Sequence, residues 1–100
     1  MDSMRNVRVM VVDDEDHIRL FVKTMLASMG CQVVAEAGDG RRAIELFDSV
    51  RPDLVLLDIN MPQMDGIATL RELRARSRDV VVIMLSSLAS LDVVQACLDA

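Results

Sequence analysis

Apolar residues gather in short, mostly uninterrupted runs along the 100-residue chain. Parallel strands that are covered on both faces have this continuous apolar pattern. The pattern therefore predicts four strands of one parallel sheet, at residues 6–12 (NVRVMVV), 31–37 (CQVVAEA), 53–58 (DLVLLD) and 79–87 (DVVVIMLSS).

Helices are predicted between these strands, because apolar residues there return at every third or fourth position. The first helix is expected to bury Ile18, Phe21, Val22, Met25, Leu26 and Met29. It should end at Gly30, since glycine suits the left-handed conformation of a C-terminal cap. The second helix is expected to bury Ala43, Ile44, Phe47 and Val50. Pairing of Arg41 with Glu45 should support this second helix, and Pro52 should stop it.

A third helix is predicted to turn Ile67, Leu70 and Leu73 inward and Arg71, Glu72 and Arg74 outward. A last amphipathic segment carries Leu91, Val94 and Leu98 on one side. Strands and helices thus alternate as (βα)₄, which predicts an α/β domain with a parallel sheet, right-handed crossovers and helices on both faces. With 52% hydrophobic and 27% charged residues, residues 1–100 are expected to form a single globular domain.

Acidic side chains follow two of the predicted strands. Asp13 and Asp14 come after the first strand, and Asp58 ends the third. The carboxyl ends of parallel strands lie at one edge of the sheet, where such folds bind ligands. If the first and third strands are neighbours, about 4.8 Å apart, these carboxylates should converge. Converging carboxylates either take up a proton or bind a cation. Oxygen ligands without histidine or cysteine favour a hard ion, and we therefore predict a Mg²⁺ site.

Other features of this edge have simpler interpretations beside the functional ones. Glu15 and Asp16 are best explained as the solvated first turn of a helix, where the helix dipole favours anions. For Asp13 and Asp14 alone, capping and metal binding are equally good explanations, and Asp58 favours the metal. A metal-bound carboxylate can attack phosphorus to give an aspartyl phosphate. The hydroxyl of Ser86, after the fourth strand, would then bind the phosphoryl oxygens, or it simply ends the strand.

The net charge of −5 argues against a surface that neutralises nucleic-acid phosphates, so we expect no direct nucleic-acid partner. The longest apolar run, residues 80–85, is far shorter than the roughly 20 residues of a membrane helix. The first residues, MDSMRNVRV, lack the apolar core of a signal peptide. A cytoplasmic protein with no membrane contact is therefore expected.

Three segments together resemble the response-regulator receiver domain: VVDDE after the first strand, LLDINMPQMDG after the third and IMLSS after the fourth. The resemblance spans nearly the whole chain, and the stretch from Asp58 to Gly66 is its most specific part. It implies a flavodoxin-like doubly wound sheet of order 2-1-3-4-5. It also implies a two-component phosphoacceptor without enzymatic activity beyond its own phosphorylation and dephosphorylation.

The resemblance also assigns roles to individual residues. Asp58 would accept the phosphoryl group from the phosphohistidine of a sensor histidine kinase. Asp14, Asp58 and the backbone carbonyl of Asn60 would bind Mg²⁺, and Asp13 would assist through water. Ser86 would be the switch hydroxyl. The domain would then signal to a downstream protein by changing the surface of its fourth helix.

Two departures from the family pattern stand out. Ser87 replaces the small residue that usually follows the switch hydroxyl, giving a Ser-Ser pair similar to that of chemotaxis methylesterase receivers. The family's fifth strand, with a lysine that contacts the phosphoryl group, and its fifth helix would follow residue 100. We therefore expect a receiver truncated at its C-terminus, (βα)₄ of (βα)₅. Its fourth strand would be an uncovered edge that promotes self-association or domain swapping.

The implied strand order also separates the two cysteines. Cys31 and Cys97 would lie on or above strands about 14 Å apart. This exceeds the roughly 7 Å that a disulfide can span, so both are expected to be thiols.

Two alternative functions deserve comparison with the receiver. The segment Gly38-Asp39-Gly40 begins GDGRRA, which fits the dinucleotide-binding pattern G-x-G-x-x-A, with Asp58 about 20 residues further on. An Asp-Gly turn into a helix explains the same residues more simply. A phosphatase with an aspartate nucleophile would need a second carboxylate two residues after Asp58, where Asn60 stands.

Overall fold

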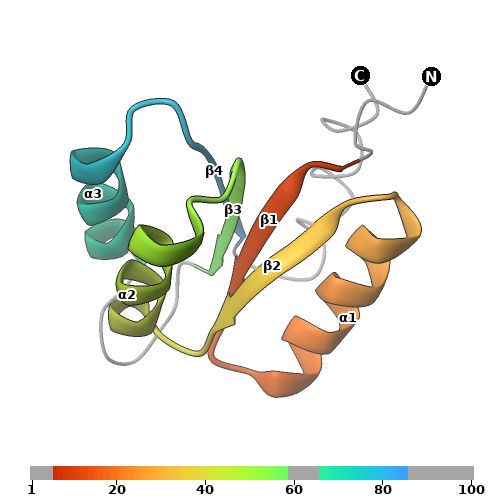
Figure 1. Ribbon diagram of the computed structural model, residues 1–100. Coiled ribbons are helices and arrows are strands. Elements are labelled where there is room, and N and C mark those ends of the chain that lie inside the picture. Colours follow the sequence, from red (N-terminus) through yellow and green to blue (C-terminus); the bar gives the residue numbers. More distant parts are fainter. Residues whose placement is uncertain (1–5, 59–65, 86–100) are drawn as a thin grey trace.

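A computed structural model describes residues 6–58 and 66–85, in which four strands alternate with three helices (Figure 1). The strands are β1 (Arg8–Val12), β2 (Gln32–Ala37), β3 (Leu54–Asp58) and β4 (Val81–Leu85). The helices are α1 (Asp16–Ser28), α2 (Gly40–Val50) and α3 (Gly66–Arg76). All seven fall within the segments predicted from the apolar pattern. The predicted last amphipathic segment and Cys97 lie outside the described residues.

The strands form one parallel sheet of order β2-β1-β3-β4. Figure 1 shows α1 on one face of this sheet and α2 and α3 on the other. Two apolar clusters match these two faces: one contains Val22 and Leu26 of α1, and the other contains Phe47 of α2 and Leu73 of α3. The doubly wound flavodoxin-like sheet implied by the family resemblance is thereby confirmed for the four described strands.

The two central strands are buried almost completely. Residues 9–12 of β1 and 54–57 of β3 are each 3% exposed or less, with successive side chains entering opposite clusters. Continuous apolar sequence is required here because helices cover both faces of a central parallel strand. This buried pair fixes the position of the residues that follow β1 and end β3.

The ends of α1 and α2 follow local rules. Gly30 has a φ of 88°, so the predicted left-handed position after α1 is confirmed. Asp39 caps α2, since its Oδ1 accepts a hydrogen bond of 2.8 Å from the Arg42 N–H. α2 ends at Val50, and its C-cap residue Arg51 adopts a left-handed conformation before Pro52, as the predicted stop requires.

Two predicted core residues are exposed. Phe21 is 55% exposed beside Leu20, because α1 packs through Val22 and Leu26, and each residue turns the helix by about 100°. Phe21 therefore lies at the margin of the apolar stripe. Ile67 is 46% exposed, because the buried face of α3 is formed by Gly66, Thr69 and Leu73. The predictions that Phe21 and Ile67 are buried were therefore wrong, and in each case a residue next to it in the sequence, Val22 or Gly66, is buried instead.

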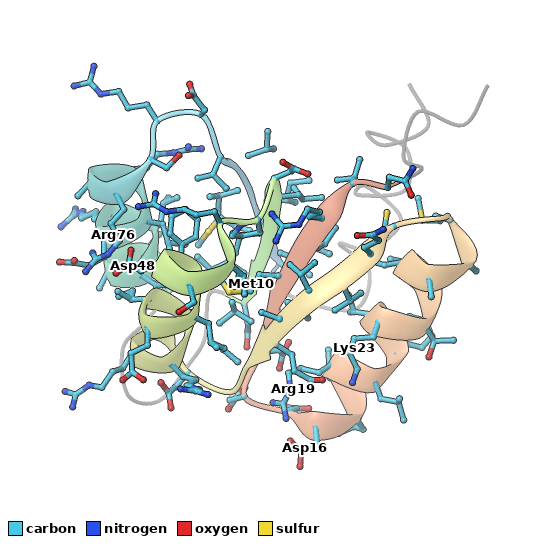
Figure 2. All side chains as sticks on the ribbon, viewed as in Figure 1. Met10, Asp16, Arg19, Lys23, Asp48 and Arg76 are labelled. Atoms are coloured by element: carbon cyan, nitrogen blue, oxygen red, sulfur yellow. The ribbon has the colours of Figure 1, made fainter. Side chains whose placement is uncertain are left out.

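The predicted Arg41–Glu45 pair was also wrong, since Glu45 instead pairs with Arg42 at 3.2 Å. Both spacings bring side chains together on a helix surface, so the sequence does not distinguish them. A further ion pair, between Asp48 and Arg76 at 3.2 Å, joins α2 and α3. Figure 2 labels both residues. Within residues 6–58 and 66–85, no helix has the length and apolar character needed to cross a membrane.

The fourth strand is the outer strand of the described sheet, paired with β3 on one side. Its first residue, Val81, is 55% exposed. Unpaired N–H and C=O groups on an apolar edge form a template for another chain. Within the described residues β4 pairs with β3 alone, and the self-association or element swapping expected from the sequence at this edge stays a prediction.

Analytical ultracentrifugation tests this expectation, with a chain extended through the family's fifth strand as the matched control. The 100-residue chain should form oligomers where the extended chain stays monomeric. A compact monomer at high concentration, with β4 amides protected from hydrogen exchange, would contradict the edge argument.

Candidate metal-binding site

The acidic residues singled out in the sequence meet at one edge of the sheet. Val12, the last residue of β1, is in register with Ala37 of β2 and Leu57 of β3. The Asp13 N–H continues this ladder by donating to the Ala37 carbonyl at 3.0 Å. Asp13 and Asp14 thus emerge from β1 at the level where β3 ends in Asp58.

Carboxylate oxygens of Asp13, Asp14 and Asp58 all lie within 4.8 Å of one another. The predicted convergence is therefore confirmed. Asp13 is 9% exposed, Asp14 is exposed and Asp58 is half-buried. A donor set made of three carboxylates fits a hard divalent cation such as Mg²⁺ better than a metal that prefers nitrogen or sulfur.

Asp13 is held in a partly desolvated setting. Its burial raises the pKa of its carboxyl group, and repulsion from Asp14 and Glu15 adds to this increase. A hydrogen bond of 2.9 Å, donated by the Glu15 N–H to Asp13 Oδ1, acts in the opposite direction. Without a cation, ionisation of Asp13 is therefore less favourable in the folded protein than in the unfolded chain.

This environment predicts a pH-dependent cost in stability. Because the folded pKa of Asp13 lies above its unfolded value of 3.8, its carboxyl group favours folding most below that value. The contribution is lost as pH rises through the folded pKa. In metal-free buffer, Asp13→Asn should therefore raise the free energy of unfolding at pH 7. At pH 3.5 the variant should match the parent chain.

Urea denaturation at the two pH values measures this difference. Asp14→Asn is the control, since Asp14 is exposed and its substitution should raise stability less. Equal stabilities of the parent chain and Asp13→Asn at pH 7 would contradict the electrostatic explanation.

The rest of the acidic run behaves as the simpler interpretation expects. Glu15 precedes α1 as its N-cap residue and its side chain makes no capping bond, and Asp16 is the acidic residue of the first turn. Both are exposed.

Arg19 was not singled out from the sequence, although its Nη1 donates to the Asp13 carbonyl oxygen at 2.6 Å. A long cation inside the otherwise apolar segment Ile18–Val22 was the available signal.

Two predicted site residues have no described position. Asn60, assigned to the metal through its backbone carbonyl, and Ser86, assigned as the switch hydroxyl, both lie outside the described residues, as does Ser87. Their roles stay predictions from the family resemblance. Cys31 is buried at the start of the β2 segment, and the expectation that both cysteines are thiols likewise stays a prediction.

The dinucleotide alternative is disfavoured by the same geometry. Asp39 of the Gly38-Asp39-Gly40 segment uses its own carboxylate on the N-terminus of α2, where a pyrophosphate would have to bind. Asp58, which that alternative assigns to a ribose, lies instead with Asp13 and Asp14. A helix-capping turn therefore explains the GDG segment.

Comparison with known proteins gives a consistent result. The family model described as "Response regulator receiver domain" matches residues 9–100. The chemotaxis protein CheY of Bacillus subtilis is 39% identical over 93 residues, which cover 89% of this chain and 78% of that protein. CheY in the CheX-CheY-BeF3-Mg²⁺ complex from Borrelia burgdorferi superposes with a TM-score of 0.80 at 31% identity, covering 95% of this chain and 72% of that one.

Some relatives are much longer than this chain. The regulatory protein AtoC of Escherichia coli is 40% identical over 85 residues, but the match spans 85% of this chain and only 18% of AtoC. The transcriptional regulatory protein PdtaR of Mycobacterium tuberculosis is matched over 45% of its length. The same fold thus occurs both in short proteins and as one part of larger ones.

Proposed function

The chain belongs to the response regulator receiver domain family of two-component signalling proteins, and on that premise we propose that it accepts a phosphoryl group on Asp58 and thereby switches a partner-binding surface. The observation that carries this proposal is the convergence of Asp13, Asp14 and Asp58 within 4.8 Å at the carboxyl edge of the sheet. No other arrangement in the described part of the chain combines a nucleophile with a cation site.

Asp58 is the nucleophile in this proposal. One of its carboxylate oxygens attacks the phosphorus of a kinase phosphohistidine, forming a P–O bond as the P–N bond breaks and its electron pair returns to the imidazole. The product is an aspartyl phosphate. Attack by water on the same phosphorus later releases inorganic phosphate and restores the carboxylate, so the domain catalyses only its own phosphorylation and dephosphorylation.

The surrounding residues divide the remaining tasks. Asp14, Asp58 and the Asn60 carbonyl would hold Mg²⁺, with Asp13 assisting through water, and the bound ion supplies positive charge against the phosphoryl oxygens. Ser86 would donate a hydrogen bond to one of these oxygens. The complex of CheX, CheY, BeF3 and Mg²⁺ from Borrelia burgdorferi supports both the ion and the phosphoryl site, because BeF3 imitates a phosphoryl group.

The proposed partners follow from this chemistry. A sensor histidine kinase supplies the phosphoryl group, and a downstream protein recognises the changed surface of the fourth helix, in residues outside the described part. The CheX–CheY complex is an example of a receiver bound to another protein. A cytoplasmic location stays a prediction.

Phosphorylation by a small phosphodonor tests the proposal without knowledge of the kinase. Intact mass spectrometry should detect one added phosphoryl group per chain in the presence of Mg²⁺, and none when EDTA is present. The chain extended through the fifth strand should be assayed in parallel, since its lysine is expected to increase the yield. Incorporation that does not depend on Mg²⁺ would contradict the proposed site.

A further inference from the structure

Arg19 of α1 contacts the backbone of Asp13, one of the three residues of the acidic site. Its side chain is 15% exposed and lies between α1 and the end of β2 (Figure 2). Its guanidinium donates to three acceptors on different segments: the Asp13 carbonyl oxygen at 2.6 Å, Glu36 Oε1 at 3.1 Å, and Asp16 Oδ1. One planar group therefore joins the end of β2, the loop after β1 and the first turn of α1.

These bonds act on the residue that carries the buried carboxylate of the site. The backbone of Asp13 is held through its N–H by Ala37 and through its carbonyl by Arg19. Its Oδ1 accepts from the Glu15 N–H, which sets the direction of the side chain. The segment from Asp13 to Asp16 is thus attached to β2 and α1 by hydrogen bonds at both of its ends.

Arg19 binds the carbonyl of Asp13 and leaves the carboxylate to the site. Its charge is instead balanced by Glu36 and Asp16, which are outside the cluster of three carboxylates. A cation that ion-paired with Asp13 directly would compete with a bound metal. This arrangement fixes the loop through the backbone of Asp13, and the described hydrogen bonds of Arg19 do not include the Asp13 carboxylate.

We propose that Arg19 is a positioning residue for the Mg²⁺ site. Its guanidinium links the Asp13 carbonyl to the carboxylates of Glu36 and Asp16. This link keeps the Asp13 and Asp14 carboxylates where they converge with Asp58. The inference rests on the proposed function, because it assumes that these carboxylates bind Mg²⁺. It adds a residue that touches neither the metal nor the phosphoryl group. Its effect is on the geometry of the loop.

Charge and geometry predict opposite results when Arg19 is replaced. Loss of a positive charge near an acidic site should strengthen cation binding, whereas loss of the loop contact should weaken it. Lys23 offers a matched control, since its Nζ binds Glu36 Oε2 at 2.6 Å from the same helix. Lys23→Gln removes the same charge and another bond to Glu36, but leaves the bond between Arg19 and Asp13.

Calorimetric Mg²⁺ titration of the parent chain, Arg19→Gln, Arg19→Lys and Lys23→Gln separates these effects. Arg19→Gln should weaken Mg²⁺ affinity about tenfold, the range typical of residues that orient metal ligands. Arg19→Lys should also weaken it, although the net charge is unchanged, because an ammonium cannot reach three acceptors in the plane of a guanidinium. Lys23→Gln should bind Mg²⁺ as well as the parent chain or slightly better.

Hydrogen exchange in metal-free buffer provides a second readout. The amide of Glu15, which donates to Asp13 Oδ1, should exchange several-fold faster in both Arg19 variants than in Lys23→Gln. Equal Mg²⁺ affinity and equal Glu15 protection in Arg19→Lys and the parent chain would overturn the positioning role. A parent chain that fails to bind Mg²⁺ would instead overturn the proposed metal site, and the inference with it.

Discussion

Asp58→Asn should abolish phosphoryl incorporation, and this is the largest effect that we expect from any single substitution. The amide nitrogen that replaces a carboxylate oxygen has nearly the same size but is a far weaker nucleophile. Since Asp58 ends a strand that is otherwise buried, the substitution conserves packing in β3. The variant should therefore fold like the parent chain and remain unlabelled when a small phosphodonor and Mg²⁺ are supplied.

Asp48→Asn is the matched control for this experiment. Asp48 is an exposed aspartate on α2 that pairs with Arg76, and such surface pairs contribute only about 0–1 kcal/mol. Its substitution makes the same chemical change away from the site, so labelling should persist. If Asp58→Asn were labelled as strongly as Asp48→Asn, the acceptor would have to be another residue.

The second large effect concerns the metal. Asp14→Ala should reduce Mg²⁺ affinity roughly tenfold or more, because it removes one of the three carboxylates that meet at the site. Asp14 is exposed, so the substitution removes a ligand without leaving a cavity in the core. Isothermal calorimetry with MgCl₂ measures the change directly.

Glu15→Ala is the matched control for charge. Glu15 belongs to the same acidic run and is also exposed, but its side chain interacts with His17 at 3.1 Å and lies outside the carboxylate cluster. Removing it lowers the local negative charge equally and should reduce Mg²⁺ affinity only slightly. Equal losses in the two variants would mean that the acidic run attracts cations without a defined site.

The sheet and its acidic edge could be predicted from the sequence because both depend on strong, local patterns. Residues 9–12 and 54–57 are apolar without interruption, and only strands covered on both faces require this. Once the strands are parallel, their carboxyl ends share an edge. The meeting of Asp13, Asp14 and Asp58 also requires β1 to pair with β3, which the family resemblance implied and the structure shows.

Side-chain contacts that depend on tertiary packing were harder to predict. Phe21 and Ile67 are apolar and have helical spacing, yet both are exposed, because the angle at which each helix meets the sheet decides which residues face inward. Glu45 had suitable partners at two spacings, and the surface conformation selects Arg42. The sequence marks Arg19 as a cation in an apolar segment, but its contacts depend on packing, because Glu36 lies on another strand and Asp13 accepts through its backbone carbonyl.

The most direct test of the account is to locate the phosphoryl group after reaction with a small phosphodonor and Mg²⁺. Reduction with borohydride converts an aspartyl phosphate to homoserine, and peptide sequencing by mass spectrometry then identifies the modified position. We expect modification at residue 58 alone, and none when Mg²⁺ is removed. Modification at Asp13 or Asp14, or at residue 58 without Mg²⁺, would contradict it.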